Sequence, residues 1–376
     1  MASGARINSF RGRPEALRTA RRCGRRPIAR GLDVVRLTRL KDWGTGLVVP
    51  DHGPSPVVID VAESTAVLAD SHPDEAELLR RLGGSGPQDW RALIENWGGA
   101  RPALETLRDV WAADPQRFEK CAVPYPDLDA PPPPLISPTA RLFAAGANFP
   151  DHASRALTKA TGKEVTAESL LAEKEKGLPP WGFTVLPGTV IGDRAQVVPP
   201  TGVQKLDYEG EVAAVLATGG RRLEPDDIRF WAVAPFCDFS IRDPFLGIGG
   251  PIDRGVLVWA LAKNFDTGNA FGPWLTTVDE GIDVTDLALE CAVNGEVRQS
   301  TTTAGMIYGF AEIAAYLSRY VELHPGDIIL SGTGAGTAVE DGVQGRFLSP
   351  GDEVSVRVRG GGVLTTSVGS PAPEAP

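Results

Sequence analysis

The segment YPDLDAPPPPLISP, residues 125–138, holds six prolines and constrains the fold of this chain more than any other feature. Proline has no backbone N–H and restricts the residue before it, so this segment cannot lie inside a helix or a central strand. We therefore interpret residues 125–140 as a linker. A chain of 376 residues is long enough for two domains, which we predict at residues 31–124 and 141–370.

The N-terminal side of the linker predicts a small α+β domain. Short runs rich in valine and leucine, broken by glycine and proline, predict paired strands within residues 33–62. Three later segments have apolar residues at helical spacing and end at glycine or at a turn, so they predict helices. These segments are DEAELLRRLGG (74–84), DWRALIENWGG (89–99) and PALETLRDVWAAD (102–114).

Beyond the linker, predicted strands outnumber predicted helices. Helical periodicity is convincing at residues 152–176 and 306–321. Many strands with few helices favour a sandwich, roll or barrel over a doubly wound sheet, so the expected fold class is α+β and β-rich. The predicted strands are RLFAAGAN (141–148), FTVLP (183–187), LDYEGEVAAVLA (206–217), RFWAVAPFCDFSI (229–241), VLVWALA (256–262), LALECAVNG (287–295), DIILSGTG (327–334) and DEVSVRVRG (352–360).

The charge of the chain is unevenly distributed. The formal net charge of −10 comes from 48 acids and 38 bases, yet residues 1–30 hold nine arginines and one acid. The remainder therefore has 29 bases and 47 acids (38 − 9 and 48 − 1), a balance of −18. Such an acidic body is a poor partner for nucleic acid. No apolar run approaches the roughly 18 residues that a membrane span needs, so we expect no membrane partner either.

The two ends of the chain and its cysteines indicate its surroundings. We predict that residues 1–30 form a basic, disordered arm and residues 371–376 a disordered tail. An organelle-targeting peptide or translated upstream sequence stays open for the arm, which lacks the apolar stretch of a secretory signal. The four cysteines are scattered without metal-ligand spacing, so the expected setting is a reduced cytoplasm without a zinc site.

The strand predicted at residues 206–217 carries acids where its apolar run begins. Residues i and i+2 of a strand share a face, so Glu209 and Glu211 would project together. Two carboxylates this close repel unless a proton or a cation neutralises them, and Mg²⁺ prefers oxygen ligands of this kind. Asp238, at the end of another apolar strand, is the predicted third ligand. A solvated edge strand without metal stays open as the alternative.

Six ordered segments resemble the fumarylacetoacetate hydrolase family. The likeness runs from about Arg141 to Val368, which is 228 residues (368 − 141 + 1). It implies a mixed β-sandwich roll as the catalytic domain, a homodimer, and Mg²⁺ or Mn²⁺ held by Glu209, Glu211 and Asp238. The segments are LDYEGEVAAVL, CDFSIRD, AKNFDTGNAFGPWL, VNGEVRQ with TTAGMIYG, LHPGDIILSGTGAG and FLSPGDEVSVRVRG.

The resemblance also implies a reaction. Members of this family act on small 1,3-dicarbonyl or 2-oxo acid compounds that chelate the metal through two oxygens. We therefore expect a divalent-metal-dependent hydrolase that cleaves a C–C bond of an acylpyruvate or fumarylacetoacetate-like substrate through a metal-stabilised enolate. Decarboxylation, isomerisation or lyase chemistry at the same site stays open, as does a degenerate member that binds metal and ligand without turnover.

Four further residues match positions of the family that act on the substrate. His152, in GANFPDHASR, corresponds to a histidine in a mobile lid, and its implied role is that of the general base. Lys263, in AKNFD, would bind a carboxylate or stabilise an enolate, and Thr333, in SGTGAG, would contact the substrate carboxylate. Arg242 is either a clamp for an anion or a structural partner of Asp243.

The chain also departs from the family pattern. Arg155 stands where many members have a glutamate that orients the histidine, and Val185 and Phe245 replace a lysine and an amide. These replacements predict a pocket that is more apolar than the family norm and a substrate that is bulkier and less anionic. Three acids downstream could take over the role of the missing glutamate: Glu164, Glu168 and Glu173.

Overall fold

The computed structural model describes residues 34–50, 55–83, 89–248, 256–278 and 281–371. All of them belong to one compact unit, Asp33–Pro376. The arm predicted at residues 1–30 lies outside the described residues, as do residues 372–376 of the predicted tail. Within the described part of the chain, every helix is too short or too polar to cross a membrane.

The largest sheet has twelve strands and includes strands from both sides of the predicted linker. The strands predicted at residues 33–62 form, but β1 pairs antiparallel with β14, so they extend this sheet instead of making one of their own. The domain division at residues 125–140 stays a prediction. The strands follow the order β4 (Ala122–Pro124), β3 (Val57–Asp60), β2 (Thr45–Val49), β1 (Arg36–Arg39), β14 (Leu275–Thr277), β11 (Phe230–Asp238), β10 (Gly210–Leu216), β17 (Ile328–Leu330), β5 (Leu142–Ala145) and β6 (Gly182–Val185), with β13 (Asn269–Phe271) beside β11 and β7 (Val190–Ile191) beside β13.

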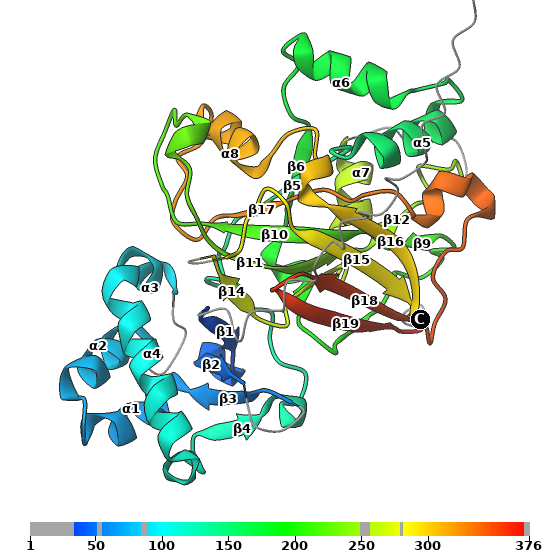
Figure 1. Cartoon of the computed structure of the whole chain (residues 1–376). Coiled ribbons are helices and arrows are strands. Elements are labelled where there is room, and N and C mark those ends of the chain that lie inside the picture. Colours follow the sequence, from blue (N-terminus) through cyan, green and yellow to red (C-terminus); the bar gives the residue numbers. More distant parts are fainter. Residues whose placement is uncertain (1–33, 51–54, 84–88, 249–255, 279–280, 372–376) are drawn as a thin grey trace, which may run out of the picture. The chain divides into compact units, whose positions relative to one another are not determined.

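A second sheet of five strands packs against the first, as Figure 1 shows for β10 and β11 beside β15, β18 and β19. Strand β10 is buried along its whole length. Val212 and Ala214 face the core between the sheets, whereas Ala213 and Val215 face the core on the opposite side. The expected β-rich α+β class is confirmed. The order is β16 (Glu296–Thr302), β15 (Ala288–Val293), β18 (Glu353–Val358), β19 (Gly362–Val368) and β8 (Gln196–Val197), and β9 (Leu206–Asp207) pairs with β12 (Ser240–Ile241) separately.

Four helices pack beside the N-terminal strands (Figure 1). They are α1 (Val61–Ala69), α2 (Pro73–Gly83), α3 (Arg91–Glu95) and α4 (Trp97–Ala113). The prediction that a helix ends at Gly98 and Gly99 is wrong, because both glycines lie inside α4, which continues through Pro102. Tertiary packing overrides these local stop signals. At Gly99 a Cβ atom would already be 3.4 Å from Leu78 of α2, so the two helices approach closely there.

Residues 256–262 were expected to form a strand, and this prediction is wrong. They belong to helix α7 (Val256–Lys263), which ends at the lysine of the AKN motif. A short, wholly apolar run has no amphipathic period, so its sequence does not distinguish a strand from a buried helix. Asn264 follows the last residue of the helix, and its side-chain amide satisfies the Ala260 carbonyl at 3.0 Å.

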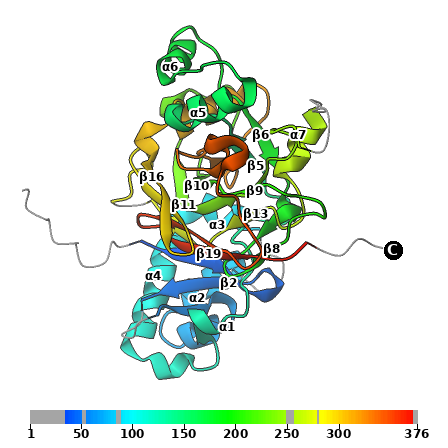
Figure 2. The same cartoon turned by 90° about the vertical axis from the view of Figure 1, so that its right-hand side faces the viewer.

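The other two predicted helices form with different bounds. Residues 152–176 make two helices, α5 (Pro150–Thr161) and α6 (Ala167–Glu175). Gly162, with φ at +66°, ends α5 in the left-handed conformation that glycine adopts readily. Helix α8 (Phe310–Ser318) begins later than expected, where the Glu312 side chain accepts from the Gly309 amide at 2.8 Å. Figure 2 shows α5 beside the 3₁₀ helix Ala338–Gln344, a contact that builds the site.

Candidate metal centre and active site

The ends of two neighbouring strands bring the three predicted ligands together. Gly210, the first residue of β10, pairs with Cys237 of β11, so Glu211 and Asp238 lie close across the pair. The backbone ladder is broken at Tyr208 and Glu209, between β9 and β10. Glu209 is held there by its own carbonyl, which accepts from the Asp238 amide at 2.9 Å. The expected strand geometry therefore holds for Glu211, whereas Glu209 belongs to the turn before the strand.

Three carboxylates form a cluster that fits a hard divalent cation. Each of Glu209, Glu211 and Asp238 offers an oxygen, and these oxygens lie within 4.8 Å of one another. Their residues are 6%, 1% and 0% exposed. One buried oxygen, Oδ1 of Asp238, has no hydrogen-bond partner among the described residues. Buried carboxylate oxygens without protein partners are costly unless a cation coordinates them, so these residues could hold Mg²⁺ or Mn²⁺.

Two buried cations adjoin the cluster. The Lys263 ammonium is 2.5 Å from Glu209 Oε2 and 2.7 Å from Asp238 Oδ2. Arg242 pairs with Glu209 as well, and its Nε donates to Asp207 Oδ2 at 3.0 Å. Asp243 instead accepts from backbone amides of Gln204 and Lys205. Arg242 therefore pairs with Asp207 and Glu209, and not with Asp243, which was one of the two roles left open for it.

The two glutamates of the cluster titrate in opposite directions. Burial alone would raise the pKa of Glu209, but the adjacent Arg242 and Lys263 cations hold that pKa well below the usual range. Burial, followed by the charges of Asp238 and Glu209, raises the pKa of Glu211 well above the usual range. Burial also raises the pKa of Asp238 to about 7, against the opposing effect of Lys263. Without a metal, the cluster therefore retains a proton at neutral pH.

Metal binding is consequently expected to release protons. A divalent cation displaces the proton that the raised pKa of Glu211 retains, so the affinity should increase as pH rises through that raised value and level off above it. The buffer takes up the released protons, so at pH 7 the calorimetric enthalpy of Mn²⁺ binding should differ between PIPES and Tris by the number of protons released times the difference between the ionisation enthalpies of the two buffers. Glu211→Gln cannot release that proton. Equal enthalpies for the wild-type protein in both buffers would contradict the prediction.

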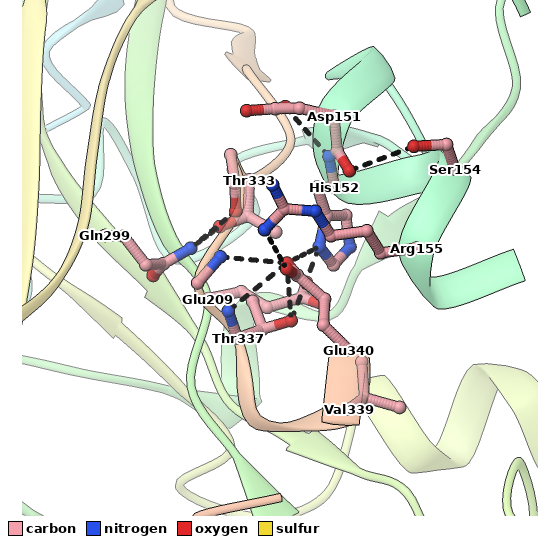
Figure 3. A network of polar contacts seen from close by, with 12 residues as sticks. Asp151, His152, Ser154, Arg155, Glu209, Gln299, Thr333, Thr337, Val339 and Glu340 are labelled. Carbon is pink, nitrogen blue, oxygen red and sulfur yellow. Dashed lines mark hydrogen bonds and ion pairs between the residues drawn. The ribbon is translucent and has the colours of Figure 1, made fainter. Parts of the chain in front are cut away.

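His152 lies over the cluster with a carboxylate as its partner. Asp151 Oδ1 accepts from the His152 amide at 2.8 Å, within the first turn of α5. The ring Nδ1 is 2.9 Å from Glu340 Oε1, and both side chains are buried (Figure 3). Burial opposes ionisation of Glu340, but its bonds to His152 and to the Gly336 amide keep its pKa below the usual value. A carboxylate at Nδ1 makes this nitrogen the donor and leaves Nε2 as a proton acceptor.

The residue that pairs with His152 is none of the three acids offered as substitutes for the missing lid glutamate. Glu340 takes that place, although 188 residues separate it from His152. The three downstream candidates all lie on the exposed surface: Glu164, Glu168 and Glu173. Glu340 is fixed in position because its Oε1 also accepts from the amides of Gly336 and Thr337, at 2.9 and 3.3 Å.

Arg155 reaches the same glutamate from the outside. Its Nη1 is 3.2 Å from Glu340 Oε2, and its side chain is 61% exposed (Figure 3). Exposed ion pairs contribute little, so Arg155→Ala is expected to lower the free energy of unfolding by less than about 1 kcal/mol. Turnover should change by less than about threefold by the same reasoning. Thermal unfolding and steady-state kinetics check these two expectations. A fall in turnover of about 10–100-fold, as expected for Glu340→Gln, would show that Arg155 takes part in the reaction.

Thr333 lies in a loop that a glutamine ties to the centre. Its hydroxyl donates to the Gly210 carbonyl at 3.0 Å and accepts from Gln299 Nε2 at 2.7 Å. Gln299 Oε1 in turn accepts from the Gly210 amide at 2.9 Å, while the Gly332 amide donates to Glu211 at 3.0 Å. The loop after β17 is therefore fixed against the start of β10, which places the Thr333 side chain at the site.

Five of the predicted site residues line one cavity of about 230 Å³. They are His152, Glu209, Arg242, Lys263 and Thr333. Phe245 also lines it, in agreement with the expected apolar wall, whereas Val185 is buried elsewhere and does not. The remaining apolar lining comes chiefly from three aromatic residues: Trp181, Phe183 and Trp259.

Sequence reasoning missed three residues that organise the site. Asp207 accepts from Arg242 and from the amides of Ala338 and Val339, so it anchors the 3₁₀ helix that carries Glu340. Asp207 lies two residues before Glu209 and on the same face of the expected strand, so the sequence could have indicated that it belongs to the site. Gln299 and Glu340 contribute through contacts between distant segments, for which a single sequence offers no local pattern.

Comparisons with known proteins place the chain in a group of related enzymes. The family model described as "Fumarylacetoacetate (FAA) hydrolase C-terminal" matches residues 141–369. Human "Oxaloacetate tautomerase FAHD2A, mitochondrial" is 33% identical over 201 residues, which are 52% of this chain and 62% of that protein. A "4-hydroxyphenylacetate degradation bifunctional isomerase/decarboxylase" of Salmonella dublin is 32% identical over 235 residues, 62% of this chain and 48% of its own length. The matches thus span less than two thirds of these relatives.

Solved structures share the fold. A putative HpcE protein from Mycobacterium smegmatis is 27% identical, with a TM-score of 0.59 over 89% of this chain and 99% of its own. A maleylpyruvate hydrolase from Sphingobium sp. SYK-6, in complex with manganese (II) ion and pyruvate, is 21% identical, with a TM-score of 0.59 over 90% of this chain and 100% of its own. The fold of the chain is therefore the one these enzymes have.

Proposed function

The chain belongs to the fumarylacetoacetate hydrolase family, and from this premise we propose that it is a divalent-metal-dependent hydrolase. Its substrate would be a 1,3-dicarbonyl or 2-oxo acid of the acylpyruvate type, cleaved at a C–C bond. The observation that carries the proposal is that His152, paired with Glu340, and Glu209 of the carboxylate cluster line the same cavity. A homodimer, a cytoplasmic location and Mg²⁺ or Mn²⁺ as the cation stay predictions.

The buried acids and bases have distinct roles in this proposal. Glu209, Glu211 and Asp238 would hold the cation, which supplies Lewis-acid polarisation of a chelated carbonyl when bound. The Sphingobium hydrolase of the same fold, solved with manganese and pyruvate, supports this class of cation. Lys263 and Arg242 are fixed cations at the same cavity, where they can bind the carboxylate of the substrate and stabilise charge on its enolate oxygen.

His152 supplies the base for hydrolysis. Because Nδ1 donates to Glu340, Nε2 can take a proton from a water that attacks the acyl carbon. The bond between the acyl carbon and the neighbouring CH₂ then breaks, and its electron pair remains on the CH₂ carbon as an enolate. Return of a proton to that carbon completes pyruvate, and Glu340 stabilises the imidazolium in between.

Tautomerisation is the second candidate, and a specific observation favours it. Several curated relatives at 32–33% identity bear the name oxaloacetate tautomerase. Exchange of a proton between carbon and the enol oxygen needs the same base and the same cluster, but it needs no attacking water. His152 would carry that proton between the two atoms.

Product analysis tests the proposal and separates the two reactions. The full-length protein is incubated with Mg²⁺ or Mn²⁺ and either acylpyruvates or oxaloacetate, while enol absorbance and released pyruvate are followed. Hydrolysis predicts one pyruvate for each acylpyruvate consumed, whereas tautomerisation predicts faster enol–keto relaxation of oxaloacetate without bond cleavage. Glu209→Gln should abolish either activity. Rates equal to those of Glu209→Gln for every compound would contradict both candidates.

A further inference from the structure

We propose that the substrate carries an uncharged aromatic group at the end remote from its oxo-acid group, as in an aryl-substituted 2,4-dioxo acid. The inference rests on the proposed function and names the substrate class of the same site. It comes from two unlike parts of the lining of the 230 Å³ cavity. One part holds the cations Arg242 and Lys263, and the other, the aromatic end, consists of rings, of which Phe183 borders Lys263 with 5.5 Å between the ring centroid and Nζ.

The aromatic end is a continuous wall of three rings. Trp259 of α7 lies edge-on to Trp181 with 4.8 Å between ring centroids, and edge-on to Phe183 with 5.2 Å. Trp181 immediately precedes β6, and Phe183 lies within this strand. Trp181 remains 53% exposed although it is packed on one side. Exposed aromatic surface in a concave wall favours binding of an apolar or aromatic ligand group, because burial and edge-to-face contact both lower the free energy of binding.

A glycine provides the place for the Trp181 ring. A Cβ atom at Gly146 would lie 2.0 Å from Cζ3 of this ring, so the indole occupies the space that a side chain would fill. The Gly146 amide also donates to the Trp181 carbonyl at 2.9 Å, which aligns the two backbones. Gly146 lies outside the positive-φ region, so close approach rather than backbone conformation requires glycine here. The position of the ring is therefore built into the local structure.

Charge excludes an anionic group from the aromatic end. Of the described residues that line the cavity, only Arg242 and Lys263 are strong cations, and both already bind the carboxylate cluster. Arg155 pairs with Glu340 and is not part of the lining. The cation that borders the wall, Lys263, is engaged by Glu209 and Asp238 and faces the oxo-acid group of the substrate, so a second substrate carboxylate at the wall would lose its hydration without a cation of its own.

The size of the cavity suits one ring. An apolar cavity of about 150 Å³ is large enough for benzene, so 230 Å³ leaves room for an aryl group beside the oxo-acid end. For 4-phenyl-2,4-dioxobutanoate, water oxygen bonds to C4, the C3–C4 bond breaks, and its electron pair goes to C3, which takes up a proton. The products are benzoate, pyruvate and one proton from the water, so the reaction is balanced.

The test compares three substrates of the full-length protein with Mn²⁺. We expect kcat/KM for 4-phenyl-2,4-dioxobutanoate to exceed that for acetylpyruvate by at least about tenfold, the scale of pocket discrimination. Maleylpyruvate, which has a carboxylate at the remote end, should be no better than acetylpyruvate. Trp259→Ala should lower kcat/KM for the phenyl compound by about tenfold and change acetylpyruvate by less than about threefold. Tyr320→Ala, which removes an exposed ring outside this cavity, is the matched control.

The outcomes separate the two proposals. Cleavage that favours maleylpyruvate would overturn the aromatic inference and leave the hydrolase standing. Cleavage of none of the three substrates would overturn the hydrolase proposal. Calorimetry would then compare the affinities for phenylpyruvate and pyruvate, and tighter binding of phenylpyruvate would show that the wall binds a ring. A second variant guards against misfolding of Trp259→Ala: Gly146→Ala should displace the Trp181 ring and produce the same selective loss. An unchanged phenyl preference in a folded Gly146→Ala protein would contradict the role of the wall.

Discussion

Replacing Glu211 by glutamine is expected to lower the affinity for Mg²⁺ and Mn²⁺ by at least about 100-fold and to abolish activity. Loss of groups that merely support a ligand costs about 10–100-fold in metal affinity, so loss of a direct ligand should cost more. The variant should remain folded, since glutamine has the same shape and its carbonyl can accept the bond from the Gly332 amide. Calorimetric titration with Mn²⁺ measures the affinity.

The same substitution should not destabilise the metal-free protein. The raised pKa of Glu211 means that ionising this group costs the folded state free energy, so the free energy of unfolding without metal falls as pH rises above the usual glutamate value. A neutral glutamine removes that cost. Thermal unfolding in EDTA at pH 8 should therefore show Glu211→Gln at or above the wild-type midpoint. Glu290→Gln, an exposed glutamate on β15, is the control, and wild-type metal affinity in Glu211→Gln would disprove the site.

Loss of His152 has the second large expected effect. His152→Ala should lower kcat by about 10²–10⁴-fold, the usual contribution of a general acid–base group. Metal affinity should stay within about twofold of wild type, because the ring belongs to α5 and is not among the three clustered carboxylates. Steady-state kinetics and Mn²⁺ titration give the two quantities separately. An unaltered kcat would remove His152 from the mechanism.

Glu340→Gln tests whether the glutamate acts through the histidine. A glutamine can keep its carbonyl oxygen on the Gly336 amide and the imidazole, with its NH₂ group toward Arg155, so the ring stays oriented but loses the negative charge that stabilises the imidazolium. We expect kcat to fall by about 10–100-fold, within the range for general acid–base groups. The double variant with His152→Ala should be no slower than His152→Ala alone, since groups that act as a unit are not additive. Additive losses would show an independent role for Glu340.

Local patterns indicated the carboxylate cluster, although they left a solvated edge strand open and the resemblance was needed to favour a metal. The i, i+2 spacing of Glu209 and Glu211 and the terminal position of Asp238 describe two strand ends that pair in the sheet. The partner of His152 could not be predicted this way, because Glu340 comes from a segment that only tertiary packing brings to α5. Three acids nearer in the sequence were reasonable candidates, yet Glu164 lies before α6 and Glu168 and Glu173 lie on it, and all three are exposed.

Fold elements with a clear local pattern were also predicted correctly, whereas those that depend on contacts between distant segments were not. Strand β10 was predicted well because it is buried on both faces and its sequence is continuously apolar from Val212 to Leu216. Helix α7 was mistaken for a strand because its seven apolar residues have no period to distinguish the two. The packing of Trp259 against Trp181 and Phe183 joins distant segments and has no local signal. The pairing of β1 with β14 joins residues about 240 apart, which no local pattern indicates.

The most direct test of the metal centre is anomalous diffraction from a crystal of the full chain grown with Mn²⁺ and oxalate, a planar dianion that can chelate the cation. The account predicts one strong manganese peak among the carboxylate oxygens of Glu209, Glu211 and Asp238, with oxalate completing the coordination on the cavity side and His152 facing it. No peak there, with Lys263 and Arg242 still bound to the carboxylates, would contradict the proposed metal-dependent enzyme.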